Sequence, residues 1–180
     1  MTILGFAGRI GSGKSTISRM ISQILGWPCL SFGDCVRTIA KERGLSVDRE
    51  SLQKLGQSLI DTDCEGFCKR VLSSYGNTKS QSVVVDGIRH TKVINTLKQL
   101  INSNDFVLIF VDTPENILLK RLDSEKNLNK KQLKELESHA TEAEVNNAIR
   151  GLADLIVDGS KPVNDICEEL VVWLKQKLLD

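Results

Sequence analysis

The chain has 180 residues, with 24 lysines and arginines against 23 aspartates and glutamates. This length predicts one domain with a sizeable core, residues 1–180, and is short for two domains. Because the charges nearly cancel, no overall field would attract nucleic acid or an anionic membrane, and we expect neither as a partner. The longest apolar run, residues 106–111, is far shorter than the roughly 20 residues that span a bilayer.

Five cysteines, at positions 29, 35, 64, 68 and 167, form no C-x-x-C pair and are odd in number. Both features argue against a disulfide framework and favour a reducing compartment. Cys64 and Cys68 are one helical turn apart, and we expect half-buried apolar side chains there rather than zinc ligands. The N-terminus lacks the basic segment of a signal peptide. We therefore expect a cytoplasmic protein, as a monomer or a small homo-oligomer.

Residues 8–16 read G-R-I-G-S-G-K-S-T and match the phosphate-binding pattern G-x-x-x-x-G-K-[ST]. An apolar run precedes this loop and an amphipathic helical pattern comes after it, which is the order such a loop requires. Its glycines allow backbone N–H groups to approach phosphates without side chains intervening. We expect Lys14 at the β- and γ-phosphates and Ser15 on Mg²⁺. The predicted ATP-binding residues of the loop are Gly8, Gly11, Ser12, Gly13, Lys14, Ser15 and Thr16.

Short apolar runs alternate with helical patterns along the rest of the chain. Buried strands of a parallel sheet read as continuous apolar runs, and five are predicted: residues 3–7, 29–32, 83–86, 106–112 and 155–157. Helices are predicted between them, including one that Gly33 and Asp34 open and that ends near Arg43. The pattern predicts an α/β fold with a five-stranded parallel sheet and helices on both faces.

Two segments stand apart from this alternation. Residues 45–76 carry apolar side chains at helical spacing from Asp48 to Tyr75, and we expect this helical insert to bind an acceptor. Residues 121–150 are expected to form a short lid. For the charged part of that lid two interpretations stay open, a solvated helix face and a cationic cover over the phosphates.

Glycines and carboxylates cluster where the predicted strands end. Ligands of parallel α/β sheets bind at the carboxyl ends of strands, so the sequence predicts an active site at that edge. Asp86 ends a strand opposite the loop and is expected to organise Mg²⁺ through water. The residues at these strand ends are Gly8, Gly33, Asp34, Asp86, Gly87, Asp112, Asp158 and Gly159.

Four segments together resemble the nucleotide-kinase branch of the P-loop NTPase fold, and adenylate kinases in particular. They are residues 8–16, S-F-G-D-C-V-R at 31–37, V-V-D-G-I-R at 84–89 and V-D-G-S-K-P-V at 157–163. The resemblance implies that Arg37 and Arg89 bind the acceptor's phosphate, with Asp34 and Gly87 beside them. Two guanidinium forks suit a dianionic phosphate on physical grounds as well.

The resemblance also assigns residues to the donor. The segment around Gly159, Lys161 and Pro162 is similar to the part that lies against the adenine of ATP. Arg121 stands nine residues after Asp112, a spacing similar to that of the family's first lid arginine. It is expected to stabilise charge on the transferred phosphoryl group, and a helix-face arginine is the alternative. Lys14, Asp86 and Arg121 are the expected catalytic residues.

Several positions depart from adenylate kinases. Glu125 stands where they carry a second lid arginine, with Lys126 or Arg150 as candidate replacements, and the lid is much shorter. Val93 stands where a glutamine reads the AMP base, so recognition of that base does not carry over. A short lid is also similar to dephospho-CoA kinases. His90 is expected to have a structural role and His139 to be exposed.

The sequence therefore predicts an ATP- and Mg²⁺-dependent phosphotransferase. It would move the γ-phosphoryl of ATP to a small phosphorylated acceptor, with a nucleoside monophosphate as the leading candidate. Two alternatives stay open: a dephospho-CoA kinase-like activity, with a hydroxyl acceptor, and a nucleotide-binding regulatory ATPase.

Overall fold

The computed structural model describes residues 1–74, 81–101, 105–126 and 148–179. Within these residues the chain forms one five-stranded sheet in which every recorded strand pair is parallel. The strand order is β2-β3-β1-β4-β5. This confirms the predicted α/β fold with its five-stranded parallel sheet. The strands are β1 (Ile3–Gly8), β2 (Cys29–Ser31), β3 (Val83–Ile88), β4 (Phe106–Asp112) and β5 (Leu155–Asp158).

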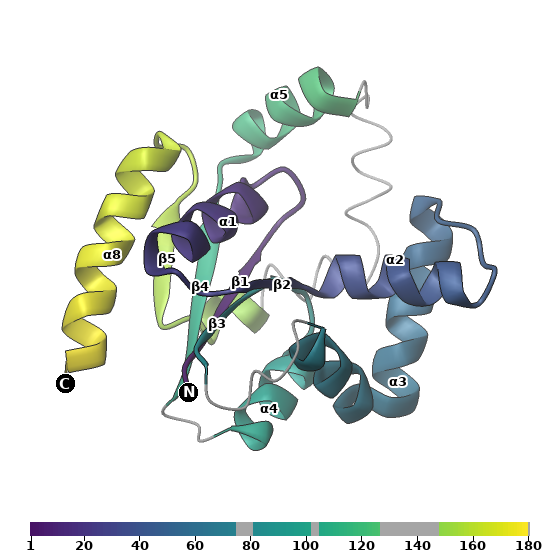
Figure 1. Ribbon diagram of the computed structural model, residues 1–180. Coiled ribbons are helices and arrows are strands. Elements are labelled where there is room, and N and C mark those ends of the chain that lie inside the picture. The colour runs from purple at the N-terminus through teal and green to yellow at the C-terminus, as the bar shows by residue number, and fades with distance from the viewer. Residues whose placement is uncertain (75–80, 102–104, 127–147, 180) are drawn as a thin grey trace.

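Helices cover both faces of this sheet (Figure 1). One face packs against α1 and α8, and the other against α2, α3 and α4. The side chains of β1, β3 and β4 alternate between the two cores, so these strands read as nearly unbroken apolar runs. The helices are α1 (Lys14–Leu25), α2 (Phe32–Glu42), α3 (Arg49–Ser73), α4 (Thr91–Leu100), α5 (Glu115–Lys126) and α8 (Val163–Leu179).

Strand β1 occupies the centre of the sheet and is buried along its whole length. Its first residue, Ile3, pairs with Val83 of β3 on one side and with Phe106 of β4 on the other. The loop after β1 therefore emerges at the middle of the sheet's carboxyl edge. This placement brings residues 9–13 between the ends of β3 and β4.

Helix α2 begins one residue earlier than the sequence predicts. The predicted strand included Phe32, whereas β2 ends at Ser31 and Phe32 is already helical. The Ser31 hydroxyl accepts a hydrogen bond from the backbone N–H of Asp34, at 3.2 Å, and so caps the helix at Ser31. Strand β3 in turn runs two residues beyond the predicted end at Asp86, to Ile88.

Helix α3 contains a break that the helical pattern did not predict. Asp63 has φ −152° and ψ 76°, outside the helical region, and its carboxylate accepts from the N–H of Gly66 at 2.8 Å. Asp63 thus acts as the N-cap of the second segment of α3. The Lys92 ammonium of α4 donates to the carbonyl of Ile60 at 2.7 Å, just before the break.

The cysteines are all free, as predicted. The expectation that Cys64 and Cys68 are half-buried is wrong, because their exposed fractions are only 5% and 0%. Both lie on the face of α3 that packs into the core. The sulfur atom of Cys64 accepts a hydrogen bond from the Thr96 hydroxyl of α4, at 3.4 Å.

The part of the predicted lid at 127–147, with His139, lies outside the described residues. The described helices include none that is long and apolar enough to cross a membrane.

Candidate active site

The loop at residues 8–16 has the backbone geometry of a phosphate cradle. Gly8, Gly11 and Gly13 have φ values of 147°, 79° and 89°, which side chains of L-residues rarely allow. A Cβ atom at Gly8 would also lie 2.6 Å from the carbonyl oxygen of Val111. Gly13 is the N-cap of α1, so the first N–H groups of that helix come directly behind the loop.

Lys14 is buried at the start of α1, with an exposed fraction of 6%. Its ammonium group donates to the carbonyl of Arg9 at 3.2 Å, which draws the side chain back across the loop. A buried ammonium group is costly unless it is paired, and anionic phosphate is the partner that such a cradle suits. The geometry fits the predicted role of Lys14 at the phosphates of ATP.

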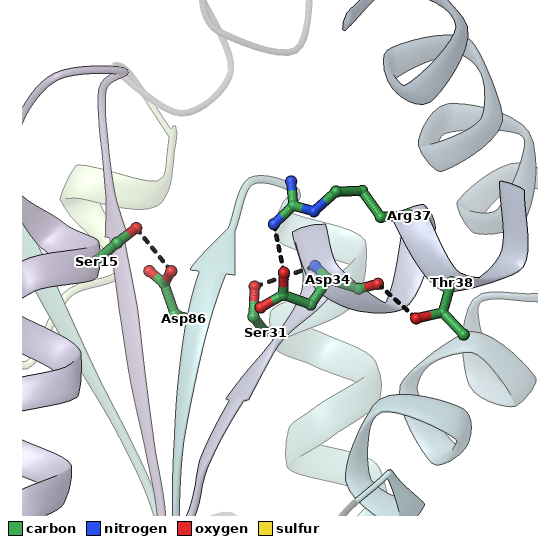
Figure 2. Close-up of polar contacts among 6 residues, drawn as sticks. All are labelled: Ser15, Ser31, Asp34, Arg37, Thr38 and Asp86. Atoms are coloured by element: carbon green, nitrogen blue, oxygen red, sulfur yellow. Dashed lines mark hydrogen bonds and ion pairs between the residues drawn. The ribbon is translucent and has the colours of Figure 1, made fainter. Parts of the chain in front are cut away.

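Ser15 and Asp86 face each other across the loop (Figure 2). The Ser15 hydroxyl donates to Oδ2 of Asp86 at 2.7 Å. Asp86 has an exposed fraction of 7%, and among the residues that the structure describes its Oδ1 has no hydrogen-bond partner. A buried carboxylate oxygen without a donor is a place where a cation or water is expected. These two oxygen ligands fit Mg²⁺, which is usually held by one or two protein groups with waters and phosphates.

A local irregularity in β3 accompanies the position of Asp86. The pairing with β1 shifts register after Asp86, and the intervening Gly87 has a φ of 86°. Bulges of this kind re-aim side chains next to active sites. Gly87 therefore forms the bulge of β3 between Asp86 and Ile88, just before Arg89.

Arg121 of α5 joins two loops that are far apart in sequence. Its guanidinium donates to the carbonyl of Ser12 at 3.2 Å and to the carbonyl of Gly159 at 2.9 Å. The buried hydroxyl of Thr113 also donates to the Ser12 carbonyl, at 3.1 Å. Arg121 therefore lies at the phosphate-binding loop, and its role toward the transferred phosphoryl group stays a prediction. Thr113 carried no comparable signal in the sequence, because it comes after a strand but belongs to no motif.

The loop after β5 is tightly turned. Asp158 accepts from both the hydroxyl and the backbone N–H of Ser160, and these bonds hold the pKa of Asp158 below its ordinary value. A Cβ atom at Gly159 would lie 2.0 Å from the Thr113 hydroxyl oxygen, so only glycine fits. Gly159 lines the same cavity as the phosphate-binding loop. Lys161 and Pro162 are not among the residues that line this cavity.

Lys161 makes a surface contact instead. Its ammonium group donates to Glu169 of α8 at 2.6 Å, and this bond raises the pKa of Lys161. Arg150, a candidate replacement for the second lid arginine, donates to the Asp112 carboxylate at 3.1 Å. The side chains of Glu125 and Lys126 lie outside the described residues.

The predicted acceptor residues lie across the sheet edge from the loop. Arg37 forms an ion pair with Asp34 one turn earlier on α2, at 2.5 Å, and keeps 49% of its side chain exposed (Figure 2). Arg37, Gly87 and Arg89 line the same cavity as Lys14 and Ser15. His90, at the N-cap of α4, is buried and lines it too.

This cavity has a volume of about 900 Å³ and reaches from the phosphate-binding loop to α3. Its far end is walled by apolar side chains from α2, α3 and α4, and by one residue of the turn before α3. Such a mixed lining, with a few charged groups and apolar walls, is typical of small-molecule sites. The apolar residues of the far end are Val36, Val47, Leu52, Ile60, Phe67 and Val93.

Sequence reasoning did not single out the polar residues of this far end. Arg49, Gln53 and Gln57 of α3 line the cavity beside the apolar wall. Their spacing of four residues was visible in the sequence and places them on one helix face. The rotation of that face toward the sheet edge depends on tertiary packing, which the sequence pattern alone does not give.

The fold and the loop define a P-loop protein, and comparison with known proteins identifies its family. A family profile described as "AAA domain" matches residues 7–140. The chain belongs to this family, and the resemblance to P-loop nucleotide kinases is confirmed.

Its relatives include proteins from archaea and bacteria. A UPF0200/UPF0201 protein from Archaeoglobus fulgidus is 28% identical over 177 residues, which cover 94% of this chain and 54% of the relative. A UPF0200 protein from Methanothrix thermoacetophila is 32% identical over 123 residues, covering 68% and 65%. An adenylate kinase from Thermotoga maritima is 29% identical over 138 residues, covering 68% and 57%. The chain thus spans less than two thirds of the length of these relatives.

Solved structures agree on the fold. A shikimate kinase from Aquifex aeolicus superimposes with a TM-score of 0.60 and 21% identity, covering 99% of both chains. A gluconokinase from Sinorhizobium meliloti superimposes with a TM-score of 0.64 and 18% identity, covering 97% of this chain and 92% of that one. The chain shares the α/β P-loop NTPase fold with these two kinases.

Proposed function

We propose that the protein is an ATP- and Mg²⁺-dependent phosphotransferase that moves the γ-phosphoryl group of ATP to a nucleoside monophosphate. One observation carries this proposal. A single cavity is lined by the phosphate-binding loop and Asp86 at one end, and by Arg37, Arg89 and an apolar wall at the other. Two ligands that meet end to end in such a cavity have their reacting phosphates between the two groups of cations.

The donor half would bind the phosphates of ATP. Backbone N–H groups of the loop and the Lys14 ammonium group would hold the phosphate oxygens, and Ser15 with Asp86 would hold Mg²⁺. When bound, Mg²⁺ supplies charge that offsets the negative phosphates. Arg121 adds a third cation, fixed through the carbonyls of Ser12 and Gly159. Thr16, Lys161 and Pro162 remain proposed ATP contacts by their place in the sequence.

The acceptor half would hold the phosphate of the monophosphate. Arg37 and Arg89 offer planar donors to its oxygens, and Asp34 orients the Arg37 guanidinium. An oxygen of that phosphate forms a bond to the γ-phosphorus of ATP, while the bond from the γ-phosphorus to the β-bridging oxygen breaks and ADP leaves. Such transfer depends mainly on positioning and charge, and no covalent enzyme intermediate is needed.

The apolar wall bears on the choice of acceptor. Six apolar side chains at the far end of the cavity would contact a flat ring favourably. The adenylate kinase among the relatives supports the same substrate class. We therefore place a nucleobase at the far end.

A coupled assay of ADP formation tests this function. The purified protein is given ATP and Mg²⁺ with each of the common nucleoside monophosphates, and with dephospho-CoA as a hydroxyl acceptor. We expect at least one monophosphate to raise ADP formation well above the rate with ATP alone. Lys14→Ala is the control for contaminating kinases and should lose this activity. A rate that no monophosphate raises would contradict the proposal, and one raised by dephospho-CoA alone would favour the hydroxyl-acceptor alternative.

A further inference from the structure

The carbonyl group of Ser12 is held by two donors from distant parts of the chain. The hydroxyl of Thr113, directly after β4, donates to its oxygen at 3.1 Å, and the Arg121 guanidinium of α5 donates at 3.2 Å. A carbonyl oxygen has two lone pairs, so these two bonds can occupy both of its acceptor positions. The peptide between Ser12 and Gly13 is therefore fixed in direction within the phosphate-binding loop.

The direction of this peptide decides where the next N–H group points. The peptide bond is planar and trans, so the N–H of Gly13 points away from the Ser12 carbonyl and hence away from Thr113. Gly13 lines the cavity, and among the described residues no hydrogen bond from its N–H is recorded. A backbone N–H that is held in one direction in such a loop is suited to bind a phosphate oxygen.

The Thr113 hydroxyl has little freedom to turn elsewhere. The residue is buried, with an exposed fraction of 3%, and its β-branched side chain is restricted at χ1. Its backbone continues from the end of β4 and precedes Pro114, and the residue before a proline is restricted to extended conformations. A buried hydroxyl without a partner is costly, and the Ser12 carbonyl supplies that partner.

The loop after β5 packs against the same hydroxyl. The N–H of Gly159 donates to the carbonyl of Asp112 at 2.6 Å, which fixes this loop to the end of β4. A Cβ atom at Gly159 would lie 2.0 Å from the Thr113 hydroxyl oxygen and 2.9 Å from the Ser12 carbonyl oxygen. The loops after β1, β4 and β5 therefore meet at the hydrogen bond between Thr113 and Ser12.

We propose that Thr113 is a positioning residue for the donor nucleotide: through the Ser12 carbonyl, its hydroxyl aligns the Gly13 N–H with a phosphate of ATP. Thr113 is not among the residues that line the cavity, so it acts through the loop and not by touching the nucleotide. This inference rests on the donor half of the proposed function, because it requires ATP at the loop. It requires nothing of the acceptor.

The test measures the Kd for ATP with Mg²⁺ by isothermal titration calorimetry, without an acceptor. Thr113→Val keeps nearly the same shape and removes the hydroxyl, and we expect it to raise this Kd by about 5- to 10-fold, the scale of one neutral hydrogen bond. The bond from Arg121 to the same carbonyl remains, so binding should weaken rather than disappear. Thr113→Ser keeps the hydroxyl, and its Kd should lie within about 2-fold of that of the unaltered protein.

Thr96→Val is the matched control. Thr96 is also a buried threonine, and its hydroxyl donates to the sulfur of Cys64 at 3.4 Å, away from the residues that line the cavity. The same chemical change at Thr96 should leave the Kd for ATP unchanged. A merely structural role of Thr113 would lower Tm, as Thr96→Val does, and leave the Kd of the folded protein unaltered. Thermal melts and Kd together therefore separate the two roles.

A second pair of variants decides the question if Thr113→Val does not fold. Thr113→Ala and Thr113→Ser differ by one oxygen atom, so the ratio of their Kd values for ATP isolates the contribution of the hydroxyl. We expect Thr113→Ala to bind ATP about 5- to 10-fold more weakly than Thr113→Ser. Equal Kd values for this pair would overturn the inference.

The outcomes separate this inference from the proposed function. If the unaltered protein binds ATP and Thr113→Val binds it with the same Kd, the inference is overturned while the proposed function stands. If the Kd rises as expected but no nucleoside monophosphate raises ADP formation, the inference stands and the proposed acceptor is wrong. If the unaltered protein does not bind ATP, both are overturned.

Discussion

Arg37 is the residue whose role is most open to direct measurement. About half of its side chain is exposed, and its guanidinium is held by Asp34 at the edge of the cavity. Replacing it with alanine should weaken binding of the acceptor phosphate and leave the donor site intact.

We expect Arg37→Ala to raise the acceptor KM by roughly 10- to 100-fold, the range for a hydrogen bond to a charged group, with the KM for ATP unchanged. Steady-state kinetics with each substrate varied in turn measure both values. Arg70→Ala is the control, because Arg70 is an equally exposed arginine that pairs with Glu42 away from the cavity. An equal rise in both KM values would indicate a structural role for Arg37.

The thiols offer a second test at the scale of single residues. Burial is the main cause that raises the pKa of Cys29, Cys35, Cys68 and Cys167, and the neighbouring Cys64 raises that of Cys68 further. A raised pKa leaves less thiolate at any given pH, and the thiolate is the reactive form.

We therefore expect alkylation by iodoacetamide at pH 8 to be slow in the folded protein and fast in guanidinium chloride. Mass spectrometry of the labelled peptides monitors each cysteine. Cys68 should be among the last to react and Cys29, which is only half-buried, among the first. Rapid labelling of Cys68 without denaturant would show that α3 and α4 separate readily.

At the scale of elements, α3 is two helical segments joined at Asp63. Asp63→Ala removes the cap on Gly66 and should lower the free energy of unfolding by about 1 kcal/mol. Asp63→Asn keeps a good N-cap, and its unfolding free energy should lie within about 0.5 kcal/mol of the unaltered protein. Urea titrations monitored by circular dichroism measure both. A more stable Asp63→Ala protein would mean that the two segments merge into one straight helix.

The break in α3 also marks a limit of sequence reasoning. Apolar side chains keep helical spacing on both sides of Asp63, so the pattern gives no sign of an interruption. The break exists because Lys92 of α4 supplies the Ile60 carbonyl with a donor and Asp63 caps the second segment of the helix. Both contacts depend on how α3 packs, which no local pattern records.

For the molecule as a whole, the sheet was predictable and much of the site was not. Strands β1, β3 and β4 are apolar runs buried on both faces, and the loop motif fixes where β1 ends, so local signals were enough to predict the fold. The contacts of Arg121 with Ser12 and Gly159 join residues up to 109 positions apart. The rotation of the polar face of α3 toward the cavity likewise depends on tertiary packing.

A prediction for the whole molecule concerns ligand binding. If ATP with Mg²⁺ binds only the folded state, a concentration of 100 times Kd stabilises the protein by about 2.7 kcal/mol. For a chain of this length that corresponds to a rise in Tm of roughly 5–10 °C. Thermal melts with and without ATP and Mg²⁺ measure it, and Lys14→Ala should lose most of the rise. A Tm that ATP does not change would contradict donor binding at this loop.

The central position of β1 has a consequence for synthesis on the ribosome. The strand is made first, but its two hydrogen-bonding neighbours, β3 and β4, end at Ile88 and Asp112. The nascent loop at residues 8–16 therefore lacks one wall of its cradle until the chain up to Asp112 has left the ribosome. Because non-local pairing of this kind is slow, the first motif in the sequence is among the last parts of the molecule to become able to bind a nucleotide.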